Sequence, residues 1–211
     1  MNLKYHYWYF KNAIPHRICD EIILHGKNKQ IELGLIGENT RKIEDGKKLT
    51  KKDLNNLKKT RNSNIAWLQD VWIYKEIQPY IDMANKLSGW NFQWDYSEPC
   101  QFTKYSKNQF YDWHCDSYID IFKTDNPNTN GKIRKLSVTC SLTDPKEYTG
   151  GELEFDLRNA NPKINTKIKC KEILPKGSIV VFPSFVWHRV KPVTKGTRHS
   201  LVIWNLGHPF K

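Results

Sequence analysis

A histidine and an aspartate stand two residues apart in the segment Trp113-His114-Cys115-Asp116. If this segment is a β-strand, alternation directs the side chains of His114 and Asp116 to one face of the sheet, while Cys115 points to the other. An imidazole nitrogen and a carboxylate oxygen on one face can hold a metal ion. Such a pair also occurs in protein cores, where a buried histidine is hydrogen-bonded to a nearby aspartate. Both interpretations are open at this point.

A second histidine lies within residues 177–206, where His188 follows an apolar run and Arg198 stands ten residues later. A barrel can bring His188 to the first pair. Two histidines and one carboxylate on one face of an octahedron leave three coordination positions open, as in non-haem Fe(II) oxygenases. One position would take O2 and two would take a chelating cosubstrate, whose distal carboxylate needs a fixed cation. The guanidinium fork of Arg198 can bind such a carboxylate bidentately.

The second half of the chain contains short β-rich segments separated by turn residues, a pattern typical of antiparallel sandwiches and barrels. The predicted strands are Cys100–Tyr105, Phe110–Asp116, Ile133–Leu142, Glu152–Asp156, Lys167–Ile173, Ser178–Phe182, Trp187–Val190 and Ser200–Leu206. Eight strands are the number that a jelly-roll barrel requires. We therefore predict a mainly β (α+β) protein whose core, residues 100–211, is a double-stranded β-helix (jelly roll).

Isoleucines recur at helical spacing in residues 15–28 and 72–87. Pro15 suits the first turn of the first helix, and Ser88-Gly89 provides a stop for the second. We expect helices to dominate residues 1–99 and to support the jelly-roll core within a single domain spanning 1–211.

Three blocks of the second half resemble the 2-oxoglutarate/Fe(II)-dependent dioxygenases. Within that family they are most similar to the prolyl 4-hydroxylase-like group, especially the PKHD-type hydroxylases of bacteria and their phages. The blocks are QFTKYSKNQFYDWHCD, RKLSVTCSLTDPKEYTGGELEF and KGSIVVFPSFVWHRVKPVTKGTRHSLVIWNLG, in the order and spacing of the family. The resemblance implies a jelly-roll core. It also implies that His114, Asp116 and His188 bind Fe(II) and that Arg198 binds 2-oxoglutarate.

The resemblance extends to further single positions. Tyr105, nine residues before His114, stands where prolyl hydroxylases place a tyrosine that contacts 2-oxoglutarate. Tyr111 and Trp204 resemble positions that line the substrate pocket. For each of these three aromatic residues, a plain core role is the alternative interpretation.

Near the end of the third predicted strand this chain has Ser141, where several relatives carry a tyrosine. The resemblance then leaves Ser137 or Thr139 to supply a hydroxyl to the cosubstrate. His199, beside Arg198 on the opposite face of its strand, is expected to be structural or exposed.

The resemblance implies a dioxygenase that uses Fe(II), 2-oxoglutarate and O2, with ascorbate as an additional reductant. Its expected substrate is proline in a peptide or protein, hydroxylated with release of succinate and CO2, as procollagen-proline 4-dioxygenases do. Related halogenases lack the carboxylate that Asp116 supplies, so hydroxylation is favoured over halogenation. Three alternatives stay open: hydroxylation of a free amino acid or another small molecule, nucleic-acid demethylation, and a non-catalytic barrel that only binds.

The 211-residue chain has 34 basic and 22 acidic residues and a formal net charge of +12. Because 27 of the basic residues are lysine, the excess resembles a diffuse lysine bias more than an arginine-lined nucleic-acid surface. We expect no nucleic-acid partner, since the sequence after His188 lacks the arginine arrangement of the nucleic-acid demethylases.

Half of the charge excess falls in residues 27–61, a polar stretch with 11 basic and 5 acidic residues. Its two open interpretations are a lid, over residues 31–62, that attracts an acidic substrate, and a flexible insertion with no role. The segment 117–132 has loop composition and is long enough to close over a site as well.

The five cysteines are widely spaced and form no CxxC pair, which argues against a disulfide framework and a structural zinc site. No run of about 18 apolar residues is present, and the first ten residues lack the order of a signal peptide. We therefore expect reduced thiols, no membrane partner and a cytoplasmic location, in the host cytoplasm if the chain is phage-encoded.

Overall fold

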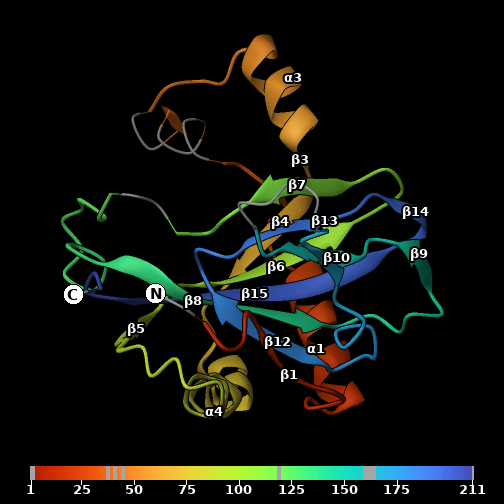
Figure 1. Ribbon diagram of the computed structural model, residues 1–211. Coiled ribbons are helices and arrows are strands. Elements are labelled where there is room, and N and C mark those ends of the chain that lie inside the picture. Colours follow the sequence, from red (N-terminus) through yellow and green to blue (C-terminus); the bar gives the residue numbers. More distant parts are fainter. Residues whose placement is uncertain are drawn as a thin grey trace.

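Figure 1 shows the computed structural model, which describes residues 3–36, 39, 42–43, 46–117, 120–158 and 165–210. Parts of the two segments expected to act as lids, 31–62 and 117–132, lie outside the described residues. The predicted fold class is confirmed: the chain is mainly β, with antiparallel sheets and a smaller share of helix.

The larger sheet has eight strands, and every neighbouring pair in it is antiparallel. In spatial order the strands are β1 (Trp8–Phe10), β12 (Ile179–Pro183), β8 (Ile133–Ser141), β15 (Arg198–Gly207), β6 (Cys100–Tyr105), β4 (Asn64–Leu68) and β2 (Glu32–Leu33), with β5 (Tyr96–Ser97) paired to β15.

The second sheet has five antiparallel strands. Their order is β11 (Lys167–Lys169), β10 (Leu153–Asp156), β13 (Trp187–Val190), β7 (Phe110–His114) and β3 (Arg61–Asn62), while β14 (Val193–Gly196) and β9 (Tyr148–Gly150) form a separate two-stranded sheet. The two sheets share an apolar cluster in which Phe155 of β10 packs edge-on against Phe182 of β12, with ring centroids 5.0 Å apart. This two-sheet arrangement is the predicted jelly roll.

The outer face of the large sheet is apolar and is covered by two helices, α1 (His16–Lys27) and α4 (Val71–Leu87). Ile22 of α1 and Ile73, Ile77 and Ile81 of α4 are fully buried in this cluster. Burying one such side chain stabilises the fold by about 1.5–3 kcal/mol. The isoleucine spacing in the sequence therefore correctly predicted both helices and the face on which they pack.

The inner face of the same sheet is polar. Strand register places Ser200 beside Thr103 and Ser141, and Trp204 beside Ser137, on the face that Arg198 also occupies. All of these polar side chains are buried. Burying polar groups is unfavourable unless they gain hydrogen-bond partners. A row of buried polar side chains between two sheets therefore indicates a ligand-binding site.

Helices α1, α3 (Lys51–Thr60) and α4 make up most of the regular structure in the first 99 residues, as expected. Five short strands that the sequence did not predict, β1 to β5, also lie there and extend both sheets (Figure 1). They have two to five residues each, too few for an alternating pattern to show, and they form because neighbouring strands supply their hydrogen-bond partners.

The polar stretch of residues 27–61 also contains a helix that the sequence pattern did not predict, α3 (Lys51–Thr60). It begins with a capping box in which the Thr50 hydroxyl accepts from the Asp53 backbone N–H and the Asp53 carboxylate accepts from the Thr50 backbone N–H.

Candidate active site

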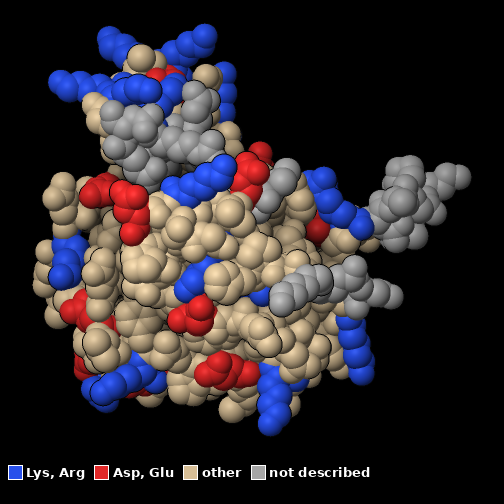
Figure 2. Space-filling view, turned by 90° about the vertical axis from the view of Figure 1, so that its left-hand side faces the viewer, with Lys and Arg blue, Asp and Glu red and all other residues tan. Residues whose placement is uncertain are grey.

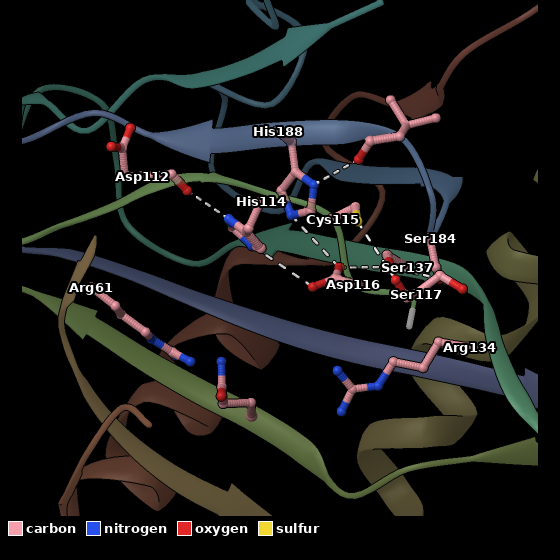
Figure 3. Close-up of polar contacts among 12 residues, drawn as sticks. Arg61, Asp112, His114, Cys115, Asp116, Ser117, Arg134, Ser137, Ser184 and His188 are labelled. Atoms are coloured by element: carbon pink, nitrogen blue, oxygen red, sulfur yellow. Dashed lines mark hydrogen bonds and ion pairs between the residues drawn. The ribbon is translucent and has the colours of Figure 1, made fainter. Parts of the chain in front are cut away.

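His114, Asp116 and His188 come together between the sheets (Figure 3). His114 and His188 are direct cross-strand neighbours on β7 and β13. Nε2 of His114 lies 3.7 Å from Oδ1 of Asp116, and Nε2 of His188 lies 3.6 Å from Oδ2. The three ligand atoms lie within 4.8 Å of one another, so the sequence prediction that a barrel would join His188 to the first pair is confirmed.

Backbone carbonyls orient both imidazoles. Nδ1 of His114 lies 2.7 Å from the carbonyl oxygen of Asp112, and Nδ1 of His188 lies 3.0 Å from that of Val186. A carbonyl only accepts, so each Nδ1 donates its hydrogen to that oxygen, and each ring presents its Nε2 to Asp116. Burial and the neighbouring His188 lower the pKa of His114 to about 3, so this ring is neutral at physiological pH.

Asp116 reaches the site for a different reason from the one the sequence suggested. Strand β7 ends at His114, so strand alternation does not extend to Asp116. Instead its backbone N–H donates to the carbonyl of Ser184 at 2.8 Å, and the Ser137 hydroxyl donates to its Oδ2 at 2.7 Å. The hydroxyl of Ser137 also lies 2.9 Å from that of Ser184. The loop after β7 is thus fixed to the turn between β12 and β13.

The charge state of Asp116 is set by opposing effects. Burial favours its neutral form, but the attraction of His188, His114 and Arg134 and the hydrogen bond from Ser137 outweigh burial and lower its pKa. At neutral pH the site therefore presents the neutral His114 ring and the Asp116 carboxylate, with Nε2 of His188 beside them. This is the donor set expected for a divalent transition metal such as Fe(II).

Arg198 lies deep in the polar face of β15 and is 2% exposed. Its Nη1 donates to the Ser200 hydroxyl at 3.2 Å, while its buried Nη2 has no hydrogen-bond partner among the described residues. A buried, half-satisfied guanidinium is unfavourable by itself and is suited to a carboxylate that would complete its hydrogen bonds. The unpaired Nη2 of Arg198 is therefore the observation that makes this site suitable for a dicarboxylate cosubstrate.

Gly151 makes room for that arginine. A Cβ at this position would lie 3.0 Å from Cδ of Arg198 and 2.9 Å from a methyl carbon of Val193, and the backbone has a positive φ of 64°. The bend at Gly150-Gly151 before β10 thus leaves Arg198 its space.

Tyr105 pairs with Arg198 across β6 and β15, and the guanidinium carbon lies 5.6 Å from its ring centroid. Burial raises the pKa of Tyr105 despite the nearby arginines, so its hydroxyl is a neutral donor. Thr139 and Ser141 lie on the same face of β8, with small side chains where a tyrosine would fill the space. The cosubstrate contacts predicted for Tyr105 and Thr139 remain predictions, whereas the Ser137 hydroxyl is engaged by Asp116.

Tyr111 stacks on the metal-site histidine, with ring centroids of Tyr111 and His114 3.5 Å apart and planes 11° from parallel. On this tyrosine lies a residue that the sequence reading missed, Arg61 of β3, whose guanidinium carbon is 4.6 Å from the Tyr111 ring centroid. Arg61 is buried and donates to the Ser63 hydroxyl and the Leu35 carbonyl, but its Nη2 has no partner among the described residues. It is the second buried guanidinium with an unpaired nitrogen beside this site.

A second ring and guanidinium pair flanks the other side of the triad. The guanidinium carbon of Arg134 lies 3.9 Å from the Trp204 ring centroid, and Glu98 holds Arg134 through two contacts of 2.7 Å. Trp204 neighbours Ser137 across the strands, and its buried Nε1 has no partner among the described residues. Trp67, 40% exposed on β4, lies 6.3 Å from Trp204. Single arginines in a lysine-rich chain gave no pattern by which Arg61 or Arg134 could be found.

His199 lies on the opposite face, as predicted, and is structural. Its ring stacks on Phe102 with centroids 5.5 Å apart, and Nδ1 lies 3.2 Å from the Thr143 hydroxyl. Burial lowers the pKa of His199 to about 4.

Comparison with known proteins agrees with this site. A family model described as the 2OG-Fe(II) oxygenase superfamily matches residues 100–205. A PKHD-type hydroxylase of Alteromonas mediterranea is 36% identical over 107 residues, which are 50% of this chain and 42% of the relative. One of Xylella fastidiosa is 35% identical over 107 residues, 50% of this chain and 43% of the relative. The match therefore spans less than half the length of these curated relatives.

Solved structures share the fold. A viral collagen prolyl hydroxylase from Paramecium Bursaria Chlorella virus-1, in a 2OG complex, has a TM-score of 0.63 at 20% identity over 97% of both chains. A prolyl hydroxylase from Trichoplax adhaerens, in complex with a hypoxia inducible factor peptide fragment, has a TM-score of 0.59 at 17% identity, covering 96% of this chain and 84% of the other. Among the described residues, no helix is long and apolar enough to cross a membrane. With its ligand triad, its buried arginine and the match of half its length to the family model, the chain belongs to the 2OG-Fe(II) oxygenase superfamily.

Proposed function

We propose that this chain is a 2-oxoglutarate- and Fe(II)-dependent dioxygenase that hydroxylates proline in a peptide or protein and releases succinate and CO2. One observation carries the substrate assignment. The metal triad lies between two pairs of an aromatic ring and a guanidinium, Tyr111 with Arg61 and Trp204 with Arg134.

A site lined by these two pairs of rings and guanidinium groups suits proline-containing peptides. Proline-rich segments bind in grooves lined by aromatic side chains because their extended conformation is already formed before binding. A proline offers a carbonyl acceptor but no backbone N–H, so recognition of its backbone requires donors. The unpaired Nη2 of Arg61 and Nε1 of Trp204 are such donors. Trp67, exposed beside Trp204, extends the aromatic surface by 6.3 Å, about two residues of an extended peptide.

The chain's own residues have defined tasks in this proposal. His114, Asp116 and His188 would hold Fe(II), and Ser137 would keep the Asp116 carboxylate oriented. Arg198 would bind the far carboxylate of 2-oxoglutarate, with Tyr105 and Thr139 beside it. When bound, the iron with 2-oxoglutarate and O2 supplies the oxidative decarboxylation and the transfer of oxygen to the substrate. Tyr111 and Trp204 would place the substrate against that centre.

The comparisons support the proposal by analogy. The curated relatives bear the name PKHD-type hydroxylase, and the two solved structures with a similar fold are prolyl hydroxylases, one of them holding a peptide. A free amino acid is the main competing substrate, and it would gain little from two ring walls and an exposed Trp67.

The test is a turnover assay of the Fe(II)-loaded protein in air, with ascorbate and 2-oxoglutarate, that measures succinate and the mass of short proline-rich peptides. The proposal expects succinate production that rises with peptide and a gain of one oxygen on proline. Peptides with alanine in place of the proline are the matched control. Stimulation by free proline but not by peptides would reassign the substrate to a small molecule. Absence of succinate with every substrate, in protein that binds the metal, would refute catalysis.

A further inference from the structure

Six exposed lysines lie on and just before helix α3, and we call five of them the lysine surface: Lys48, Lys51, Lys52, Lys58 and Lys59. Residues 46–60 contain six lysines and a single acidic residue, Asp53. Figure 2 shows the basic side chains gathered on the projection at the top of the molecule, where Figure 1 places α3. Residues 46–60 thus carry a net charge of +5 (six lysines minus Asp53) out of the chain's +12.

This projection is joined directly to the candidate active site. Helix α3 contacts β3 and β7, and Arg61, the first residue of β3, follows Thr60 at the helix end. Arg61 stacks on Tyr111, which stacks on His114. A helix of ten residues is about 15 Å long, so the lysine surface lies within a few residues' reach of a peptide that leaves the site past Arg61.

The lysines are presented by an ordered scaffold. The capping box of Thr50 and Asp53 fixes the start of α3, and Leu57, 1% exposed, anchors its end. The carboxylate of Asp53 is engaged by Thr50 and by Lys42, whose Nζ is 2.9 Å from Oδ1, and this leaves the lysine surface unbalanced within the helix. A fixed array of like charges is unfavourable for the folded chain by itself and favours an acidic ligand.

We propose that the lysine surface docks acidic residues flanking the reacting proline, so that the preferred substrate is a proline in an acidic segment of a peptide or protein. This inference rests on the proposed function. Residues 46–60 contain no arginine and no aromatic residue, so they lack the guanidinium forks and stacking rings by which single-stranded nucleic acids are held. Carboxylates need neither a guanidinium fork nor a ring for binding, because the ammonium group of a lysine attracts them as a point charge.

The experiment compares three peptides with the same proline core and glutamate, glutamine or lysine flanks, using the wild-type Fe(II)-loaded protein and two double variants. Lys52→Glu/Lys59→Glu reverses two charges on α3. Lys75→Glu/Lys86→Glu reverses two exposed lysines on α4, at the opposite end of the molecule, and is matched in net charge (Figure 1). The measured quantity is kcat/KM for hydroxylation at low and high salt.

We expect wild type to prefer the glutamate over the glutamine peptide by about fivefold to tenfold at low salt. The preference should fall toward unity at about 0.3 M salt, since the Debye length is then well below 10 Å. Lys52→Glu/Lys59→Glu should invert the preference, and Lys75→Glu/Lys86→Glu should keep it. Equal efficiency of the three peptides in wild type, or the same loss in both double variants, would overturn the inference and leave the proposed function standing.

Binding of fluorescently labelled peptides distinguishes failure of the proposed function from failure of the inference about the lysine surface. If no peptide is hydroxylated, the proposed function fails, and binding still tests the surface. Glutamate peptide bound by wild type and lost in Lys52→Glu/Lys59→Glu supports an acidic ligand, whereas equal binding overturns it. Tighter binding of a single-stranded oligonucleotide than of the glutamate peptide, lost in the same variant, would also overturn the proposal and assign the surface to nucleic acid.

Discussion

Replacing Arg198 with methionine should separate cosubstrate binding from folding. Arg198 is 2% exposed, and among the residues that the structure describes its side chain has one hydrogen bond, the 3.2 Å contact to Ser200. A hydrogen bond to a charged group contributes about 1.5–3 kcal/mol, so loss of the guanidinium should weaken 2-oxoglutarate binding about 10- to 150-fold. Methionine keeps most of the volume and removes a buried charge that lacks a full set of partners. The unliganded variant should therefore be at least as stable as wild type.

Thermal unfolding with Mn(II) in place of iron measures both effects without turnover. At about 100 times its Kd, 2-oxoglutarate should stabilise wild type by about 2.7 kcal/mol. For a chain of this length that corresponds to a rise in Tm of about 5–10 °C. At the same ligand concentration Arg198→Met should retain only about 0.3–1.4 kcal/mol of this stabilisation.

The control is Arg198→Lys, which keeps the charge but not the fork and should give an intermediate shift. An equal rise in Tm for wild type and Arg198→Met would show that another group binds the distal carboxylate. A large loss of stability in the unliganded variant would show that the guanidinium is a structural residue, contrary to the argument from its orphaned nitrogen.

Three further predictions concern the proposed metal ligands, Ser137 and His199. His114→Ala or Asp116→Ala should abolish succinate production, and undiminished production in either variant would refute the ligand set. Ser137→Ala should weaken metal binding about 10- to 100-fold, because it releases the Asp116 carboxylate. The measurement is the affinity for Co(II) and the spectrum of bound Co(II), with unchanged circular dichroism as the control for folding. An unaltered Co(II) spectrum would show that Ser137 does not orient the carboxylate. Because the pKa of His199 is lowered to about 4 in the folded chain and is about 6.5 unfolded, the unfolded state binds its proton first as pH falls, and stability should decline between about pH 6.5 and 4. His199→Phe should flatten that decline in urea unfolding, and an unchanged pH slope would contradict the assignment.

Some features of this protein were determined by local sequence. The strands Cys100–Tyr105 and Trp187–Val190 occur at the predicted residues, and the isoleucine spacing correctly predicted α1 and α4. These elements are long enough, or apolar enough, to show their own periodicity. The proposed metal ligands were also indicated, since the pattern of His114, Asp116 and His188 allowed a metal site and the resemblance to the dioxygenases favoured it over a plain core pair.

Other features depended on the tertiary structure. The strands β1 to β5 are short and form because an existing sheet pairs with them. Asp116 is held by Ser137 and Ser184, which are 21 and 68 positions away in the chain, and Arg61 meets Tyr111 only because β3 pairs with β7. A side chain of this kind has no local signature, because its partners come from distant segments. The sequence by itself determined which residues could bind iron and 2-oxoglutarate, while the packing of the two sheets decided which arginines, rings and hydroxyls surround them.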